Sequence, residues 1–172
     1  MHEQTRLPLR PWLIGLAIFA LVVLLGIWLR SQSIYGIVDH QLAGTAEQVD
    51  AIQDQWRAEG VRWLAILAML GDLVFIGVYG WGAWVVGRAL AARDDMLARV
   101  LGWTVALAAV LFLITDYAET VLQFIQLVRS DGSDTMARIA ASMQGTKIAS
   151  WIASFVGVLA AIVLNRFSLG RA

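Results

Sequence analysis

The sequence contains no cysteine, and this absence excludes several kinds of site at once. Disulfides, thiolate metal sites, iron–sulfur clusters and cysteine nucleophiles all require that side chain. Histidine is nearly absent too, and His2 and His40 both lie outside the long apolar segments. A haem held by two intramembrane histidines, or a histidine-ligated zinc site inside a bilayer, therefore cannot be built. We expect no metal site and no cofactor.

Charged residues are scarce, at 15% of the 172 residues, and 13 Lys and Arg balance 13 Asp and Glu. Nucleic-acid binding needs a basic field, so we expect no nucleic-acid partner. Apolar residues are abundant instead, at 59% of the chain with a mean hydropathy of +0.70. Soluble domains have about 45–50% apolar residues. The composition therefore predicts an integral membrane protein, and the expected partner of its apolar surface is the lipid bilayer.

Four long apolar segments could each cross a bilayer as a helix, which needs about 20 residues. We expect the spans at about 12–29, 61–86, 97–128 and 146–164. The first span follows Arg6 and Arg10 and continues into Trp28 and Arg30 without a small-residue cleavage pattern, which favours a retained helix over a secretory signal. The predicted fold class is all-α: one membrane domain over residues 1–172, with four transmembrane helices in an up-and-down bundle.

The loop between the first two spans, residues 30–60, is polar and acidic. Thr45 and Gln48 have the spacing of a capping box that opens a helix, and Gly60 would end that helix. Its apolar residues recur at three- and four-residue spacing, at Val49, Ile52 and Trp56. We expect a short amphipathic helix here, lying on the membrane surface or over the mouth of the bundle. A solvated loop helix is the alternative.

The third span carries the most informative polar residues. Asp116 and Glu119 lie three residues apart and therefore share one helix face. Gln123 and Gln126 continue that face, while the other positions of the span are mostly Leu, Val, Ala and Ile. A stripe of four polar side chains cannot face lipid. We expect it to face the other helices.

Two other spans carry polar groups that could meet this stripe. Asp72 in the second span lies at a depth similar to that of Asp116, roughly 17 Å from the presumed outer boundary at 1.5 Å per residue. In the fourth span, Lys147 and Ser150 begin a second polar stripe, with Lys147 about 9 Å from Glu119 along the bundle axis. We expect three helices to line one polar pocket. Its candidate ligand- or cation-binding residues are Asp72, Asp116, Glu119, Gln123, Lys147 and Ser150.

Three ionised carboxylates exposed inside a bilayer would oppose insertion by about 8–10 kcal/mol. Protonation, pairing with Lys147, or a cation or water in the pocket would offset that cost. The functional interpretation is an outward-opening pocket that binds or conducts a proton, a cation or a cationic small molecule such as a cationic amphiphile. The structural alternative is a hydrogen-bonded polar core that only fixes the register of the helices.

Two other functions stay open. The second span is rich in glycine, which predicts close helix contacts and suits an accessory subunit that packs against a larger membrane complex. The third hypothesis is an intramembrane acid–base enzyme acting on a lipophilic substrate. We lean away from an enzyme, because the stripe offers no nucleophile, metal-ligand set or phosphate loop. A homo-oligomer or a membrane partner subunit is compatible with each of these hypotheses.

The distribution of Lys and Arg bears on the orientation of the chain. With the N-terminus inside, seven of these residues fall on the cytoplasmic side and six on the outer side. Arg88, Arg93 and Arg99 crowd one short loop, which favours both termini in the cytoplasm. We expect the protein in a bacterial inner (plasma) membrane.

Overall fold

The computed structural model of the chain describes residues 7–169, and the side chains of residues 7–166. His2 and Arg6, named above, lie outside these residues, as does Arg171, one of the seven basic residues counted on the cytoplasmic side. The chain is 87% helix, and no strand occurs in the part that the structure describes. The helices in order are α1 (Arg10–Gln32), α2 (Ile37–Leu42), α3 (Ala46–Ala58), α4 (Arg62–Ala91), α5 (Met96–Arg129) and α6 (Asp134–Leu169).

Four of these helices, α1, α4, α5 and α6, are long and apolar enough to cross a membrane. The all-helical class and the four apolar helices predicted from the sequence are therefore confirmed. Local chemistry sets where they begin. Pro11 lies in the first turn of α1, where backbone N–H groups have no acceptor within the helix, so the missing N–H of proline costs no hydrogen bond. The Asp95 side chain caps α5 by accepting a hydrogen bond from the Ala98 amide at 2.8 Å.

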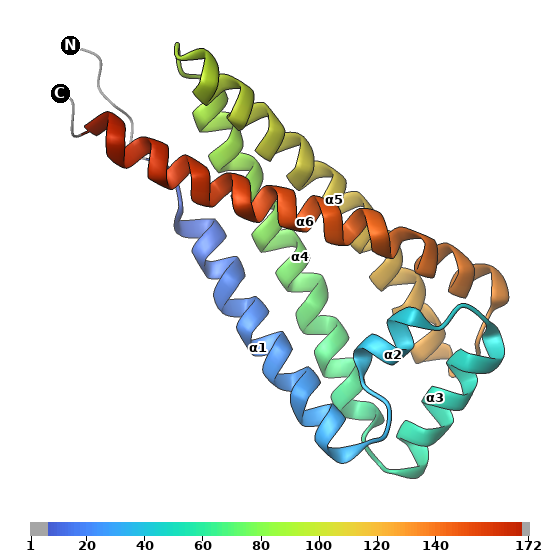
Figure 1. The fold of residues 1–172 in the computed structure, drawn as a ribbon. Coiled ribbons are helices and arrows are strands. Elements are labelled where there is room, and N and C mark those ends of the chain that lie inside the picture. Colours follow the sequence, from blue (N-terminus) through green and yellow to red (C-terminus); the bar gives the residue numbers. More distant parts are fainter. Residues whose placement is uncertain (1–6, 170–172) are drawn as a thin grey trace.

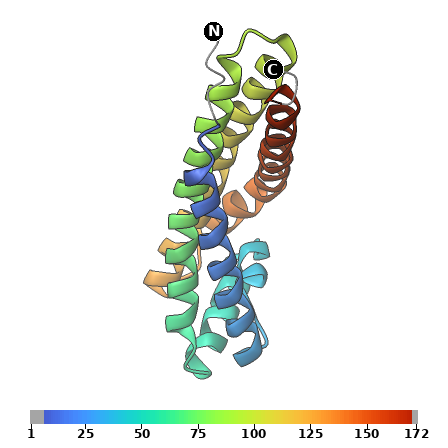
Figure 2. The same ribbon diagram turned by 90° about the vertical axis from the view of Figure 1, so that its left-hand side faces the viewer.

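The long helices pack side by side in a fixed order. Helix α4 lies between α1 and α5, and α5 packs in turn along α6, as Figure 1 shows. The turn between α4 and α5 and the C-terminal end of α6 lie at one end of the molecule, whereas α2 and α3 lie at the other (Figure 2). We call the end formed by α2 and α3 the capped end.

Glycines allow α4 to approach its neighbours closely. A Cβ atom on Gly82 would lie 2.6 Å from the Cα atom of Trp12 in α1. A Cβ atom on Gly87 would lie 2.6 Å from the Ala106 amide nitrogen and 2.8 Å from the Gly102 carbonyl oxygen in α5. Backbone therefore lies against backbone at both contacts, as the glycine content of the second span predicted.

Aromatic side chains fill the space between the long helices away from the capped end. Tyr79 is fully buried, and its ring meets that of Phe112 edge to face with 5.4 Å between centroids. Trp12 and Phe75 pack on the same tyrosine, at 6.4 and 5.3 Å. The Tyr79 hydroxyl forms a hydrogen bond with the Ser154 hydroxyl at 3.1 Å. This half of the molecule is a largely apolar core, and the Tyr79–Ser154 hydrogen bond is a polar contact inside it.

Helix α6 begins at Asp134, well before the predicted start of the fourth span near residue 146. The segment from 134 to 145 contains Ala, Met and Arg, which favour a helix, but its polar residues lower its hydropathy. A search for apolar runs therefore misses it. Ala137 and Ala140 are buried, so this extra length of helix also packs against the chain.

The loop helix predicted over 45–59 is confirmed as α3, whose N-cap Thr45 accepts a hydrogen bond from the Gln48 amide at 3.3 Å. Gly60, with a φ of +70°, follows it. The predicted apolar side chains are all buried: Val49, Ile52 and Trp56. Helix α2 was not predicted, because six residues are too few for a periodic signal.

Side chains from distant parts of the sequence hold the capped end together. The Asp134 carboxylate at the start of α6 accepts a hydrogen bond from the Ala46 amide at 2.7 Å. The Asp50 carboxylate of α3 accepts one from the Gly132 amide, also at 2.7 Å. Helix α3 is thereby fixed to the turn between α5 and α6.

Candidate functional site

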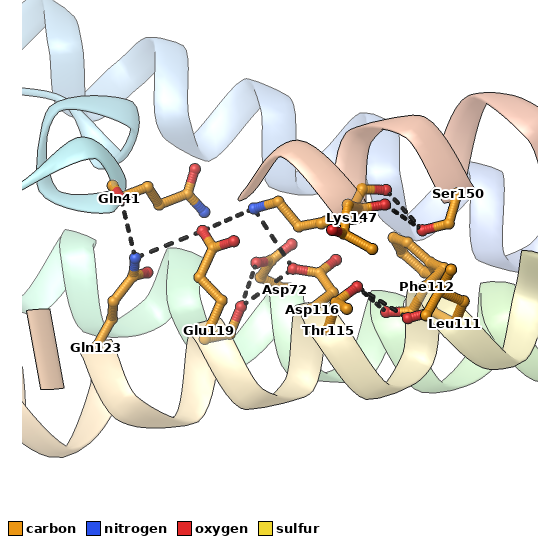
Figure 3. A network of polar contacts seen from close by, with 12 residues as sticks. Gln41, Asp72, Leu111, Phe112, Thr115, Asp116, Glu119, Gln123, Lys147 and Ser150 are labelled. Carbon is orange, nitrogen blue, oxygen red and sulfur yellow. Dashed lines mark hydrogen bonds and ion pairs between the residues drawn. The ribbon is translucent and has the colours of Figure 1, made fainter. Parts of the chain in front are cut away.

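Three helices contribute charged side chains to one polar cluster near the capped end. Asp72 comes from α4, Asp116 and Glu119 come from α5, and Lys147 comes from α6; Figure 3 shows them facing one another. Asp116 and Glu119 are 4% and 0% exposed. Gln123 and Gln126 are buried as well, so the polar stripe predicted from the sequence faces the interior.

Lys147 is the cation of this cluster. Its Nζ atom donates a hydrogen bond to Oε1 of Glu119 at 2.7 Å and lies 3.6 Å from Oδ1 of Asp116. Its own side chain is only 12% exposed. Charge-assisted contacts of this kind are stronger than neutral hydrogen bonds, and burial reduces their screening. Lys147 is therefore an internal counter-ion for two carboxylates.

The third carboxylate, Asp72, has a weaker polar neighbour. Its Oδ2 atom accepts a hydrogen bond from the Thr120 hydroxyl at 3.3 Å, and the same hydroxyl lies 3.4 Å from Oδ1 of Asp116. A hydroxyl carries one proton, so it can donate to only one of the two carboxylates at a time. The cluster thus contains three acids, one amine and one shared hydroxyl.

Gln123 connects the cluster to the capped end. Its Nε2 atom donates to the Gln41 carbonyl of α2 at 3.3 Å and to Oε1 of Glu119 at 3.4 Å (Figure 3). Oε2 of Glu119 and Oε1 of Gln123 are buried and have no hydrogen-bond partner among the described residues. Buried acceptors of this kind normally have a partner, so the cluster has capacity for a further donor.

Two of the polar side chains considered from the sequence lie outside this cluster. Ser150 is buried, but its hydroxyl donates to the carbonyls of Thr146 and Lys147 in its own helix, at 2.7 and 3.0 Å. Oε1 of Gln126 accepts a hydrogen bond from the Ser133 amide at 2.9 Å and stabilises the turn before α6. The structure therefore brings together five of the six candidate residues.

A cavity of about 630 Å³ lies beside the cluster. Asp72, Asp116 and Lys147 supply charged groups to its wall, whereas Glu119 lies behind them and is not part of the lining. Most other lining residues are apolar, among them Phe19, Val22, Phe75, Phe112, Ile148 and Trp151. The volume and the apolar wall with a few polar groups are typical of a small-molecule site.

The sequence argument missed two parts of this cavity. Helix α1 supplies one wall over the length from Phe19 to Arg30, although it carries no acid. Helix α2 covers the cavity at the capped end, where Asp39 forms an ion pair of 3.4 Å with Arg30. The predicted pocket of three helices is therefore a cavity bordered by five.

His40 of α2 points away from the cavity into the core of the capped end. It is 1% exposed and stacks on Trp56 with 5.3 Å between ring centroids. Its Nε2 atom lies 3.3 Å from Nε2 of Gln53. Burial lowers the pKa of His40 from 6.5 to about 4, so the ring is neutral in the folded protein at neutral pH.

Acidification should therefore weaken the fold through His40. Because its folded pKa lies below the unfolded value, the unfolded chain gains a proton first as the pH falls from about 6.5 towards about 4. We expect this group to lower the free energy of unfolding by roughly 2 kcal/mol between about pH 7 and about pH 5. Thermal unfolding of the parent and of His40→Phe, which keeps an aromatic ring on Trp56, measures the effect. An equally steep loss of stability in both proteins would contradict it.

No family model, curated protein or solved structure matches the chain. Within the described residues, no group of three or more His, Asp or Glu side chains is placed to hold a metal ion. The function must therefore be argued from the geometry of the cluster and of the cavity beside it.

Proposed function

We propose that the chain is an integral membrane protein whose cavity binds a cationic small molecule through Asp72 and Asp116. The observation that carries this proposal is the placement of Asp72 and Asp116, with Lys147 beside them, in the wall of a cavity whose other lining is mostly apolar and includes four aromatic rings, while Arg30 and Asp39 pair with each other at its capped end. Organic cations are bound in this way, because carboxylates neutralise their charge while aromatic faces attract the cation and exclude water.

The charges of the cluster support a second cation beside Lys147. When its four ionisable groups are charged, the three acids exceed the one amine by two negative charges. Lys147 contacts Glu119 and Asp116, whereas Asp72 accepts a hydrogen bond from the Thr120 hydroxyl. A ligand cation beside Asp72 would reduce the repulsion between that carboxylate and Asp116.

The proposal includes the bilayer. Helices α1, α4, α5 and α6 cross it in up-and-down order, and both termini face the cytoplasm of a bacterial cell, as the distribution of Lys and Arg favours. The capped end then lies on the outer side. The positions of the turn between α4 and α5 and of the end of α6 at one end of the molecule support this arrangement (Figure 2).

No observation favours the other two hypotheses over this one. The glycines of α4, whose number suited an accessory subunit, face groups of the same chain, as Gly77 does with Tyr117 and Gly80 with Leu113. An accessory role therefore gains no support from them. The cluster has no nucleophile activated by a neighbouring base, so an enzymatic role gains none either.

The proposal is tested by ligand-dependent thermal stability of the purified protein with tetramethylammonium and butylamine as probes. A ligand that binds only the folded state at a hundredfold excess over its Kd adds about 2.7 kcal/mol. We expect the parent to be stabilised, and Asp72→Asn and Asp116→Asn to require at least about tenfold more probe, because each variant removes one negative charge from the cavity wall.

Asp131→Asn is the matched control, since Asp131 is exposed in the turn before α6 and does not border the cavity. It should respond to the probes like the parent. Equal stabilisation of the parent and Asp116→Asn would overturn the proposal. So would the absence of any probe effect together with carboxylate variants as stable as the parent, which is the result expected of a structural polar core.

A further inference from the structure

The mouth of the cavity is bordered by exposed aliphatic side chains. Val23 and Ile27 of α1 are 40% and 61% exposed, Val38 of α2 is 62% exposed, and Ile148 of α6 is 49% exposed. All four line the cavity. Aliphatic groups gathered at an opening mark contact with an apolar environment rather than with water. On helices that cross a bilayer, that environment is the lipid.

The mouth lies where α1 and α6 separate. Away from the capped end, the two helices meet through the rings of Trp12 and Phe155 and of Phe19 and Trp151, whose centroids lie 5.8 and 5.6 Å apart. They have no extended packing along their lengths, and Figure 1 shows them diverging towards the capped end. The aromatic rings thus close the cavity at one end and α2 covers it at the other, which leaves the side between α1 and α6.

The cavity is longer than a small cation requires. Its lining on α1 runs from Phe19 to Arg30, which corresponds to about 16 Å along the helix. Gly71, the neighbour of Asp72, faces Val22 of α1: an added Cβ atom on Gly71 would lie 3.1 Å from the valine side chain. The carboxylates therefore lie part of the way along the stretch of α1 that lines the cavity. A small ammonium group would fill only the charged part. The remainder is lined mainly by aliphatic side chains, with the Arg30–Asp39 ion pair at its capped end, and suits a chain of methylene groups.

We propose that the ligand is a single-chain cationic amphiphile that enters from the lipid between α1 and α6. Its ammonium group binds at Asp72 and Asp116, and its alkyl chain lies in the apolar part of the cavity beside Gly26. This inference rests on the function proposed above and specifies the class of ligand. Entry from the lipid also explains why the capped end can be closed by α2 and α3 without blocking the site.

Two glycines allow a matched test. A Cβ atom on Gly26, which lines the cavity, would have no atom within 4 Å, and the same is true of Gly145 in α6, which does not line it. A Cβ atom therefore fits at either position without displacing a neighbour, and substitution by leucine improves helix propensity equally at both. Only Gly26→Leu places a new side chain in the path of the proposed alkyl chain.

The experiment compares dodecyltrimethylammonium with tetramethylammonium in nanodiscs of uncharged phospholipid. Each buried methylene group strengthens binding by about fourfold, so Gly26→Leu should weaken binding of the dodecyl probe by at least about tenfold by displacing a few of them. Tetramethylammonium should bind the variant within about twofold of the parent. Gly145→Leu should match the parent for both probes. Because both variants are studied in the same bilayer, partitioning of the probe into lipid cancels between them.

Equal affinity of Gly26→Leu and Gly145→Leu for the dodecyl probe would overturn the inference. If tetramethylammonium binding were still lost in Asp116→Asn, the proposed function would stand without it. Equal weakening of both probes by Gly26→Leu would overturn the assignment of the chain to this part of the cavity. Failure of both probes to bind the parent would overturn the proposed function and the inference together.

Discussion

Lys147→Met should destabilise the protein by roughly 3–5 kcal/mol, because removing one partner of a buried ion pair leaves the other charge uncompensated. Glu119 is fully buried, and its Oε1 atom accepts the hydrogen bond from Nζ of Lys147 at 2.7 Å. Asp116 loses the same cation at 3.6 Å. Methionine keeps the length and apolar character of the lysine stem, so the loss of stability reflects the missing charge rather than a change in side-chain volume.

Thermal unfolding of three further variants separates charge from packing. Arg138→Met removes an exposed cation from the same helix and should change stability by less than about 0.5 kcal/mol. Glu119→Gln combined with Lys147→Met removes both charges of the closest pair, and should recover much of the loss. Glu119→Gln alone leaves Lys147 beside Asp116. A stable Lys147→Met protein, or a double variant no better than the single one, would show that this ion pair does not stabilise the helices.

Gly102→Leu should have the second large effect, at roughly 3 kcal/mol or more. An added Cβ atom there would lie 2.7 Å from the Ala91 Cα atom and 2.7 Å from the Gly87 carbonyl oxygen, both of which belong to the backbone of α4. Backbone cannot move aside as the end of a flexible side chain can. The helices would have to separate at the end of the molecule opposite the capped end.

The measurement is the midpoint of thermal unfolding, with Gly145→Leu as the control at a position where an added Cβ atom has no neighbour within 4 Å. That control should be neutral or stabilising by up to about 1 kcal/mol, because leucine favours a helix more than glycine does. If the two variants were equally stable, α4 and α5 would not be held at the close separation described above.

The polar stripe of α5 was predictable because helix geometry alone decides it. Residues three or four apart share a face, so Asp116, Glu119 and Gln123 had to point the same way once the segment was taken as a helix. The cost of exposing them to lipid then required that face to be buried. The prediction that Asp72 reaches the same place needed only similar depths in adjacent antiparallel helices.

The structure shows that the Lys147 side chain reaches Glu119, a contact that the sequence left open. The sequence argument placed the two residues about 9 Å apart along the axis, because it began the fourth helix at the edge of the apolar run near residue 146. The helix begins at Asp134 and crosses the molecule at an angle, so Lys147 lies well inside it (Figure 1). Hydropathy locates apolar surface, but it does not locate helix ends or crossing angles.

The walls contributed by α1 and α2 could not be predicted for a different reason. An aliphatic residue that faces a cavity and one that faces lipid are the same residue in the sequence, so nothing distinguishes Val22 or Gly26 from their neighbours. Helix α2 is harder still to predict, because its position depends on contacts with distant residues, such as the hydrogen bond between the Gln41 carbonyl and Gln123. Neither wall produces a periodic pattern in the sequence.

The hydrogen bonds that hold the capped end together also determine how early this end can be completed during synthesis. Helices α2 and α3 are made early, yet their partners lie 82 to 88 residues later: Gln123 for α2, and Gly132 and Asp134 for α3. Helices α2 and α3 can pack on α1 and α4 as soon as these are made, but their hydrogen bonds to Gln123, Gly132 and Asp134 form only after α5 and the start of α6. Lys147 follows later in α6, so Asp116 and Glu119 have no lysine beside them until that part of the chain has been made. The proposed ligand site is therefore complete only after α6 has packed against the other helices.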